Sequence, residues 1–192
     1  MFDRCTWLNE PPSHRIDDGG TLHVVTGDQT DFWRITSYGF IHDNGHFLAG
    51  RVEGSFTAQV LVHADFTTLY DQAGLMVRID AHRWLKAGVE FSDGQPMLST
   101  VLTNERSDWA TMPAPALPDG FWLRVTVDGG AIRVQYSADG CVWPLLRLAP
   151  FPEAEHYLVG PMCCTPQRAG LDARFSDFTV GPALGKDLHD LT

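Results

Sequence analysis

The chain has 192 residues, of which 44% are hydrophobic and 20% charged, an ordinary composition for one folded globular domain. Its formal net charge is -10 and it contains no basic run. This argues against a nucleic-acid binder, because phosphate contacts need clustered cations. No apolar segment has the length of a signal peptide or of a membrane span, so we expect a cytoplasmic protein without a membrane partner.

The four cysteines, Cys5, Cys141, Cys163 and Cys164, show neither CxxC spacing nor a Cys/His cluster. We therefore expect free thiols in a reducing cytosol rather than disulfides or a zinc site. The sequence also lacks the GxSxG, P-loop and GxGxxG patterns that mark nucleophile elbows and nucleotide sites. No cofactor and no metal are predicted.

Short runs of alternating apolar residues between turn signals predict an all-β protein, and only the stretch after Trp109 leaves room for a helical turn. The predicted strands run from Thr21 to Thr26, Asp31 to Thr36, Gly54 to His63, Gln72 to Ile79, Trp84 to Phe91, Leu98 to Thr103, Trp122 to Asp128, Ile132 to Ser137, Val142 to Leu148, Tyr157 to Cys164 and Leu171 to Val180. They are too many for a minimal immunoglobulin-like sandwich and indicate one two-sheet antiparallel jelly roll over residues 1-180. Residues 181-192 lack strand periodicity and are predicted to be a loosely held C-terminal tail.

Among the eight histidines, His42 and His46 lie closest together, on either side of Asp43-Asn44-Gly45. Asn-Gly is a signal for a hairpin turn, so the sequence favours two surface imidazoles beside a turn over a metal site.

The strands Gln72 to Ile79 and Trp84 to Phe91 carry the most informative pattern. Their odd-numbered positions are apolar and must face a core, so the even-numbered positions face outward on one shared sheet face. A three-residue loop, Ala81-His82-Arg83, would place Arg78 opposite Lys86 and Gly74 opposite Glu90. Arg78 and Lys86 would then be opposed cations that an acidic neighbour or an anionic ligand group could offset.

Gly74 and Gly88 lie in strand interiors, and their lack of side chains predicts a depression in the polar face. Planar aromatic faces beside hydrogen-bonding groups suit a sugar or a small polar molecule. The predicted ligand-binding residues are Tyr70, Gln72, Arg78, Trp84, Lys86, Glu90 and Trp109. The alternative is a solvated outer sheet face with glycines at bulges. A carboxylate lies near an indole in two segments, Asp31-Phe32-Trp33 and Ser107-Asp108-Trp109. The tryptophans are either part of a hydrophobic wall, with the aspartates as turn residues, or both residue types form the edge of a site.

A second signal for strand pairing is Gly129-Gly130, which fits a two-residue type I′ turn and pairs Val127 with Ile132 and Leu123 with Tyr136. Asp139-Gly140 repeats the turn signal and predicts Tyr136 opposite Trp143 on the core face.

An enzyme of the glycosidase kind would need two carboxyl groups flanking a bond. Glu90 is the candidate acid or base, and Lys86, Asp108 or Asp71 is the candidate partner. Lys86 and Glu90 are four residues apart on one strand, too far for a direct ion pair.

The segments TDFWRITSYGFIHDNGH, YDQAGLMVR, WLKAGVEF, TNERSDW, YSADG and VGPM together resemble the family of domains of unknown function that includes the fungal regulation-of-enolase protein. The resemblance covers about Trp7 to Phe178. It implies a concanavalin A-like lectin/glucanase sandwich with a ligand groove on its concave face. The E-x-D-x-x-E pattern of the glucanases is absent, since the chain reads EFSDGQ from Glu90.

These observations predict a lectin-like domain that binds a carbohydrate or a sugar-derived small molecule on its polar sheet face, with Arg78 and Lys86 receiving any anionic group. The alternatives are a glycoside-processing enzyme and, from the enolase-linked relatives, a regulatory domain with a protein partner.

Overall fold

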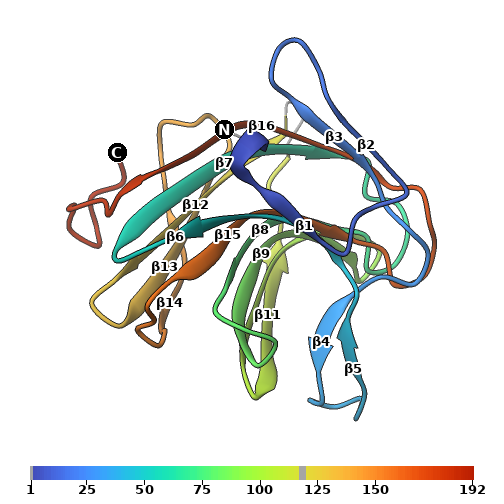
Figure 1. Cartoon of the computed structure of the whole chain (residues 1–192), viewed down its shortest axis with the longest axis horizontal. Coiled ribbons are helices and arrows are strands. Elements are labelled where there is room, and N and C mark those ends of the chain that lie inside the picture. Colours follow the sequence, from blue (N-terminus) through green and yellow to red (C-terminus); the bar gives the residue numbers. More distant parts are fainter. Residues whose placement is uncertain (1, 117–119) are drawn as a thin grey trace.

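The computed structural model describes residues 2–116 and 120–192. Two seven-stranded antiparallel sheets lie face to face, with a small separate hairpin beside them (Figure 1). Sheet A has the order β1 (Thr6–Leu8), β6 (His46–Val52), β15 (Tyr157–Cys164), β8 (Gln72–Arg78), β9 (Arg83–Ser92), β10 (Gln95–Asn104) and β11 (Arg106–Pro113). Sheet B has the order β14 (Leu145–Pro150), β13 (Ala131–Ser137), β12 (Phe121–Asp128), β7 (Phe56–Ala64), β16 (Asp172–Pro182), β3 (Leu22–Val25) and β2 (Ser13–Ile16). The hairpin pairs β4 (Phe32–Arg34) with β5 (Ile41–Asp43), and a 3-10 turn, η1 (Phe2–Arg4), precedes β1.

The predicted all-β, two-sheet antiparallel jelly-roll sandwich is confirmed, and the described ranges contain no α-helix. The same residues include no helix long and apolar enough to cross a membrane.

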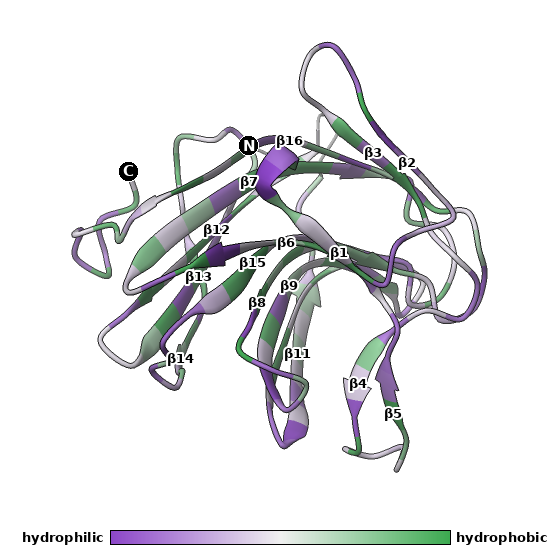
Figure 2. Cartoon of the chain, viewed as in Figure 1, coloured by the Kyte–Doolittle hydropathy of each residue, from purple (hydrophilic) through white to green (hydrophobic). Residues whose placement is uncertain are grey.

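The hydrophobic core lies between the two sheets and takes alternate residues from each strand. From β8 and β9 it takes the predicted odd-numbered positions, and from sheet B the facing positions of β7, β12 and β13. Members that are at most 1% exposed include Val60, Val62, Ala73, Leu75, Val77, Leu85, Ala87, Val89, Leu123, Val125, Ile132 and Val134. Figure 2 shows hydrophobic and hydrophilic bands alternating along the strands, the pattern of a sheet with one face buried.

A second, smaller hydrophobic cluster lies on the outer face of sheet A, between that face and the hairpin β4–β5. Phe32 and Trp33 of the hairpin pack there with Met76, Trp84 and Met162 of the sheet. This face of sheet A is therefore not a simple solvated surface, because the hairpin covers part of it.

The turn at Gly129-Gly130 has the predicted register. Val127 pairs with Ile132 and Leu123 with Tyr136, and both glycines have positive φ values, 54° and 74°. The prediction for the next turn is wrong. Tyr136 donates its amide to the carbonyl of Pro144, and Trp143 packs against Trp122 on the outer face of sheet B.

The predicted register of β8 and β9 is also wrong by two residues, although the faces are right. Arg78 pairs with Trp84 and not with Lys86, and Gly74 pairs with Gly88. The reason is the start of the loop. Asp80 accepts the backbone amides of His82 and Arg83 through Oδ1, at 2.8 and 2.9 Å, which closes the turn one residue earlier than predicted.

The stretch after Trp109 is not helical. It continues β11, which pairs with β10 from Asn104↔Arg106 to Met97↔Pro113. Strands β1, β2, β5, β6 and β11 were not predicted. β6 is buried on both faces over His46–Ala49, so it lacks the alternation that would reveal it.

Asp43-Asn44-Gly45 is a corner rather than a hairpin turn. β5 pairs with β4 and β6 pairs with β1 and β15, while the amides of Asn44 and Gly45 donate to the carbonyl of Asp31. His46 is consequently buried, with 4% exposure, and contacts Asn9 and Gly27, so only His42 is the surface imidazole that was expected.

Strand β16 extends to Pro182, and the residues after it cross the outer face of sheet B. Leu184 donates its amide to Thr57 Oγ1 at 2.8 Å, and Trp143 donates its amide to the carbonyl of Leu191 at 2.8 Å. Arg133 donates to the carbonyl of Lys186 at 3.2 Å.

Candidate functional site

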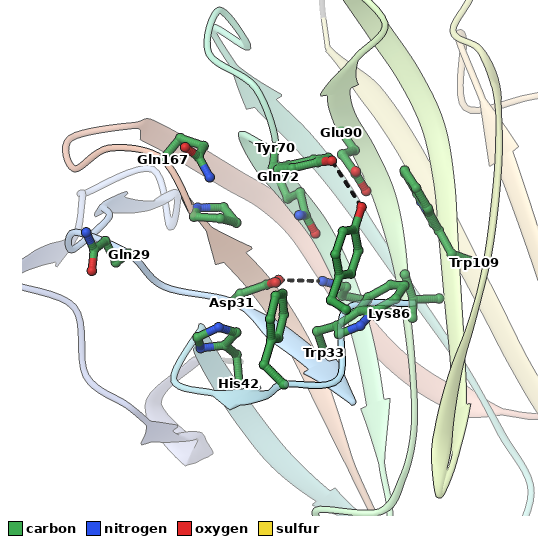
Figure 3. A pocket seen from close by; sticks show the side chains of 14 residues that line it. Gln29, Asp31, Trp33, His42, Tyr70, Gln72, Lys86, Glu90, Trp109 and Gln167 are labelled. Carbon is green, nitrogen blue, oxygen red and sulfur yellow. Dashed lines mark hydrogen bonds and ion pairs between the residues drawn. The ribbon is translucent and has the colours of Figure 1, made fainter. Parts of the chain in front are cut away.

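A cavity of about 320 Å³ lies between the outer face of sheet A and the hairpin β4–β5 (Figure 3). Its lining combines aromatic, amide and charged side chains from both, with contributions from the neighbouring loops. The lining residues are Gln29, Asp31, Trp33, Tyr38, Phe40, His42, Tyr70, Gln72, Lys86, Glu90, Val101, Trp109, Pro166 and Gln167. We call the part formed by Gln72, Lys86 and Glu90 the polar floor.

The polar floor follows from strand parity. Gln72 lies directly opposite Glu90 in the β8–β9 ladder, and Lys86 lies four pairs further along, opposite Met76. Because side chains alternate across a sheet, these even-numbered residues share the face away from the core. Figure 3 shows them pointing into one space beneath the hairpin.

Lys86 forms a buried ion pair with Asp31, which precedes β4. Its Nζ lies 3.0 Å from Asp31 Oδ1, and the two side chains are 4% and 15% exposed. The backbone amide of Phe32 donates to the same carboxyl oxygen at 2.7 Å. Burial, the largest single effect, would lower the pKa of Lys86, but the nearby groups of Asp31, Cys164 and Glu90 together outweigh it and raise that pKa. The ammonium therefore stays charged, and the pair ties the hairpin base to the sheet.

Glu90 belongs to a chain of hydrogen bonds that runs to the cavity wall. The indole Nε1 of Trp109 donates to Ser99 Oγ at 3.1 Å, and the Ser99 hydroxyl donates to Glu90 Oε2 at 2.9 Å. Burial raises the pKa of Glu90, although Lys86 and the Ser99 hydrogen bond oppose the shift.

Aromatic rings form the walls above the polar floor. The ring of Trp33 meets Trp109 at 90° with centroids 6.2 Å apart, and Tyr70 meets Trp109 at 72° and 6.4 Å. Tyr38 meets Trp33 at 67°, and its hydroxyl lies 3.4 Å from that of Tyr70. This hydrogen bond, with burial, raises the pKa of Tyr70 to about 12. The Tyr70 phenol is therefore a neutral hydrogen-bonding group at neutral pH.

The hairpin is held over the sheet by polar contacts outside the cavity. Arg78 binds Asp43 in a bidentate ion pair, with distances of 2.6 and 2.8 Å. The backbone amide of Arg34 donates to Ser107 Oγ at 2.9 Å. At the tip, Ile35 and Ser37 have positive φ values of 65° and 64°, which turn the chain so that Tyr38 reaches the cavity.

The structure brings five of the predicted ligand-binding residues together at the cavity: Tyr70, Gln72, Lys86, Glu90 and Trp109. The other two lie outside it. Arg78 is turned to Asp43, and Trp84 is 1% exposed beneath Phe32, with ring centroids 6.2 Å apart. Neither Arg78 nor Trp84 lines the space.

Two of the candidate acid-base partners of Glu90, Asp108 and Asp71, also lie outside the cavity lining. Asp108 pairs with Arg147 at 2.9 Å and does not line the cavity. Asp71 is fully buried and is bound by Arg168, with distances of 2.9 and 2.5 Å. Lys86 and Asp31 are the charged groups that share the cavity with Glu90.

Gly74 and Gly88 do not form the hollow that the sequence suggested. A Cβ at Gly74 would lie 1.9 Å from the carbonyl oxygen of Ala87, and one at Gly88 would lie 2.1 Å from that of Ala73. The glycines therefore allow close approach of two backbones. The space beside Gly88 holds only about 10 Å³.

The hairpin side of the site was missing from the prediction. The sequence shows Asp31 and Trp33 as a carboxylate beside an indole, but no pattern in it indicates that they pack against β9. Tyr38, Phe40 and His42 follow them in an aromatic run, FWRITSYGFIH, and that density of exposed aromatic residues was the available signal. Among the residues that the structure describes, no group of three or more His, Cys, Asp or Glu side chains could hold a metal.

The comparisons with known proteins agree with this architecture. Residues 7–183 match the model of the family described as protein of unknown function (DUF1349). The chain is similar to Regulation of enolase protein 1 of Saccharomyces cerevisiae, with 54% identity over 97% of this chain and 94% of the relative. A crystal structure of a functionally unknown protein from Saccharomyces cerevisiae superposes with a TM-score of 0.93, at 53% identity over 96% of this chain and 99% of that one.

More distant structures share the fold alone. A GH43 protein from Bacillus licheniformis superposes with a TM-score of 0.67 at 17% identity, over 91% of this chain and 37% of that one. The sandwich is thus of the concanavalin A-like type that the resemblance implied.

Proposed function

The chain belongs to the DUF1349 family of proteins of unknown function, and we propose that it is a lectin-like domain that binds a carbohydrate or a sugar-derived small molecule in the cavity beneath the hairpin β4–β5. The observation that carries the proposal is the pairing of a polar floor, Gln72, Lys86 and Glu90, with walls made by Trp33 and Trp109.

Two physical features support a sugar-like ligand. A pyranose ring has apolar C–H faces that pack on aromatic rings and equatorial hydroxyls that need hydrogen-bond partners. The cavity offers both, and its volume of about 320 Å³ lies at the lower end of the range for small-molecule pockets. Long polymers would have to enter end-on or pass along its rim.

The direct test is calorimetric titration of the native protein against a panel of mono- and disaccharides, with a glycan array as the first screen. We expect Trp109→Ala and Glu90→Gln each to weaken binding at least tenfold, about 1.4 kcal/mol. Glu155→Gln, at a side chain that is 88% exposed and lies outside the cavity lining, is the matched control and should bind as the native protein does. Absence of binding across the panel would contradict the proposal.

A second candidate function is glycoside processing with Glu90 as general acid or base. The observation that favours it is that burial raises the pKa of Glu90 while a second carboxyl group, that of Asp31, faces the same cavity. Turnover of aryl glycosides by the native protein, lost in both Glu90→Gln and Asp31→Asn, would support it. If the native protein binds sugars but turns over none of these substrates, the result contradicts glycoside processing and supports binding as the function.

The name of the yeast relative supports a protein partner as well. Because this chain is 54% identical to that relative over 97% of its length, we propose that it takes part in the regulation of enolase through a direct contact. Cys141, Cys163 and Cys164 carry free thiols, and the last two are buried, which supports work in a reducing cytosol. Sedimentation of purified enolase with this protein tests the contact, and a complex that survives Glu90→Gln would place it outside the cavity.

A further inference from the structure

The ammonium group of the cavity lining already has its counter-charge without a ligand. The lining contains two carboxyl groups, those of Asp31 and Glu90, and one ammonium group, that of Lys86. The ammonium lies 3.0 Å from Asp31 and is almost fully buried by it. An anion bound at Lys86 would have to share the ammonium with Asp31 and would lie beside that carboxylate, which weakens its own attraction to the cation.

The neighbouring arginines do not supply a free cation. Both terminal nitrogens of Arg78 donate to the carboxylate of Asp43. Arg147 contacts Asp108 and Thr100. Within the described lining, the remaining basic side chain is His42, whose ring packs edge-on against Phe40 at 4.5 Å.

The other polar groups of the lining are uncharged. Gln29, Gln72 and Gln167 present amides, and Tyr38 and Tyr70 present phenols. Figure 3 shows the amide of Gln72 between Glu90 and Asp31 on the floor. Amides and phenols both donate and accept, as sugar hydroxyls do, so they match a polyol without requiring charge.

We infer that the cavity selects an uncharged polyhydroxylated ligand and rejects the matching sugar acid or sugar phosphate. The inference rests on the proposed function and sets its ligand class. An anion entering this space would lose its hydration next to Glu90 and Asp31 and would find no uncompensated cation, so the site discriminates against it. This inference differs from the expectation from sequence that Arg78 and Lys86 receive an anionic group, because both cations are paired with carboxylates of the chain.

The test compares matched ligands on the native protein at pH 8. Each neutral sugar of the panel is titrated beside its uronic acid and its phosphate ester by calorimetry. We expect every neutral sugar that binds to do so at least tenfold more tightly than both anionic counterparts. Equal or tighter binding of an anionic counterpart would overturn the inference while leaving the proposed function intact. Failure of both series to bind would overturn the proposed function and the inference together.

A variant at Asp31 should gain affinity for anionic ligands. Asp31→Asn keeps a side-chain oxygen for the amide of Phe32 but leaves Lys86 without its counter-charge. We expect the ratio of anionic to neutral affinity to rise at least tenfold in this variant. Asp108→Asn is the matched control, since that carboxylate is 67% exposed and outside the cavity, and its ratio should stay at the native value.

If Asp31→Asn has too low a melting temperature, Glu90→Gln replaces it. This variant removes the other carboxyl group with little change in shape, and the same affinity ratio should rise. An unchanged ratio in whichever of the two variants is folded would contradict the charge argument.

Discussion

The ammonium of Lys86 and the carboxylate of Asp31, 55 positions apart in the chain, lie 3.0 Å from each other beneath the hairpin β4–β5. This pair joins the outer face of sheet A to the chain segment that roofs it. It gives the ammonium of the polar floor its counter-charge.

Removing one partner of this pair should destabilise the protein. We expect Lys86→Met to lower the free energy of unfolding by about 3 kcal/mol, because Asp31 is left partly buried without its counter-charge. Lys186→Met is the matched control, since that ammonium donates to Thr192 near the surface. Urea denaturation of both variants checks the expectation, and equal losses would contradict it.

Glu90 predicts a pH dependence of stability with a definite sign. Its pKa is raised in the folded state, so the folded protein holds this proton more strongly than the unfolded chain does. Stability from this group is therefore present below the unfolded pKa of about 4.3 and is lost as pH rises through the folded value. Glu90→Gln should match the native protein in stability at pH 4 and equal or exceed it at pH 7.

The measurement is the difference in free energy of unfolding between Glu90→Gln and the native protein across that pH range. A difference that falls as pH rises would mean that the carboxylate is stabilised in the fold.

The hydroxyl of Ser99 links Trp109 to Glu90, so its removal should take a hydrogen-bond partner from both side chains. Ser99→Ala leaves the indole N–H and Glu90 Oε2 without this partner, and we expect a cost of about 1–2 kcal/mol with weakened sugar binding. Ser92→Ala on β9 is the control, because the buried Ser92 hydroxyl has no hydrogen-bond partner in the described structure. That variant should be neutral or slightly stabilising.

Denaturant midpoints and calorimetry on the two serine variants separate these outcomes. A Ser99→Ala protein with native affinity would show that Glu90 and Trp109 are held by other contacts.

Gly74 predicts a steric effect that is independent of the ligand. Gly74→Ala would bring a methyl group within 1.9 Å of the carbonyl of Ala87, so the β8–β9 ladder must shift, and we expect a loss of about 3 kcal/mol or failure to fold. Gly181→Ala is the control because its Cβ would meet nothing within 4 Å. Thermal melts of the two alanine variants should differ clearly, and similar melting temperatures would contradict the crowding.

Local pattern was enough to identify much of the molecule. Alternation along β8 and β9 placed Ala73 and Val89 in the core and Lys86 and Glu90 on a common outer face, because side-chain direction in a strand depends only on position along it. The register of β12 and β13 followed from Gly129 and Gly130, since two consecutive positive φ angles admit few turns.

Other features depended on which distant segments meet. The placement of a short hairpin over a sheet has three such effects. It turns Arg78 toward Asp43 and away from the cavity, and it pairs Lys86 with Asp31. It also brings the aromatic run around Tyr38 to the cavity wall. Residue order carries no direct record of that placement, because it results from packing of Phe32 and Trp33 on Met76 and Trp84. The sequence alone therefore determined the sandwich and the polar face, and only the tertiary structure decided that this face is roofed, that Lys86 on it has a counter-charge and that it is shaped as a cavity.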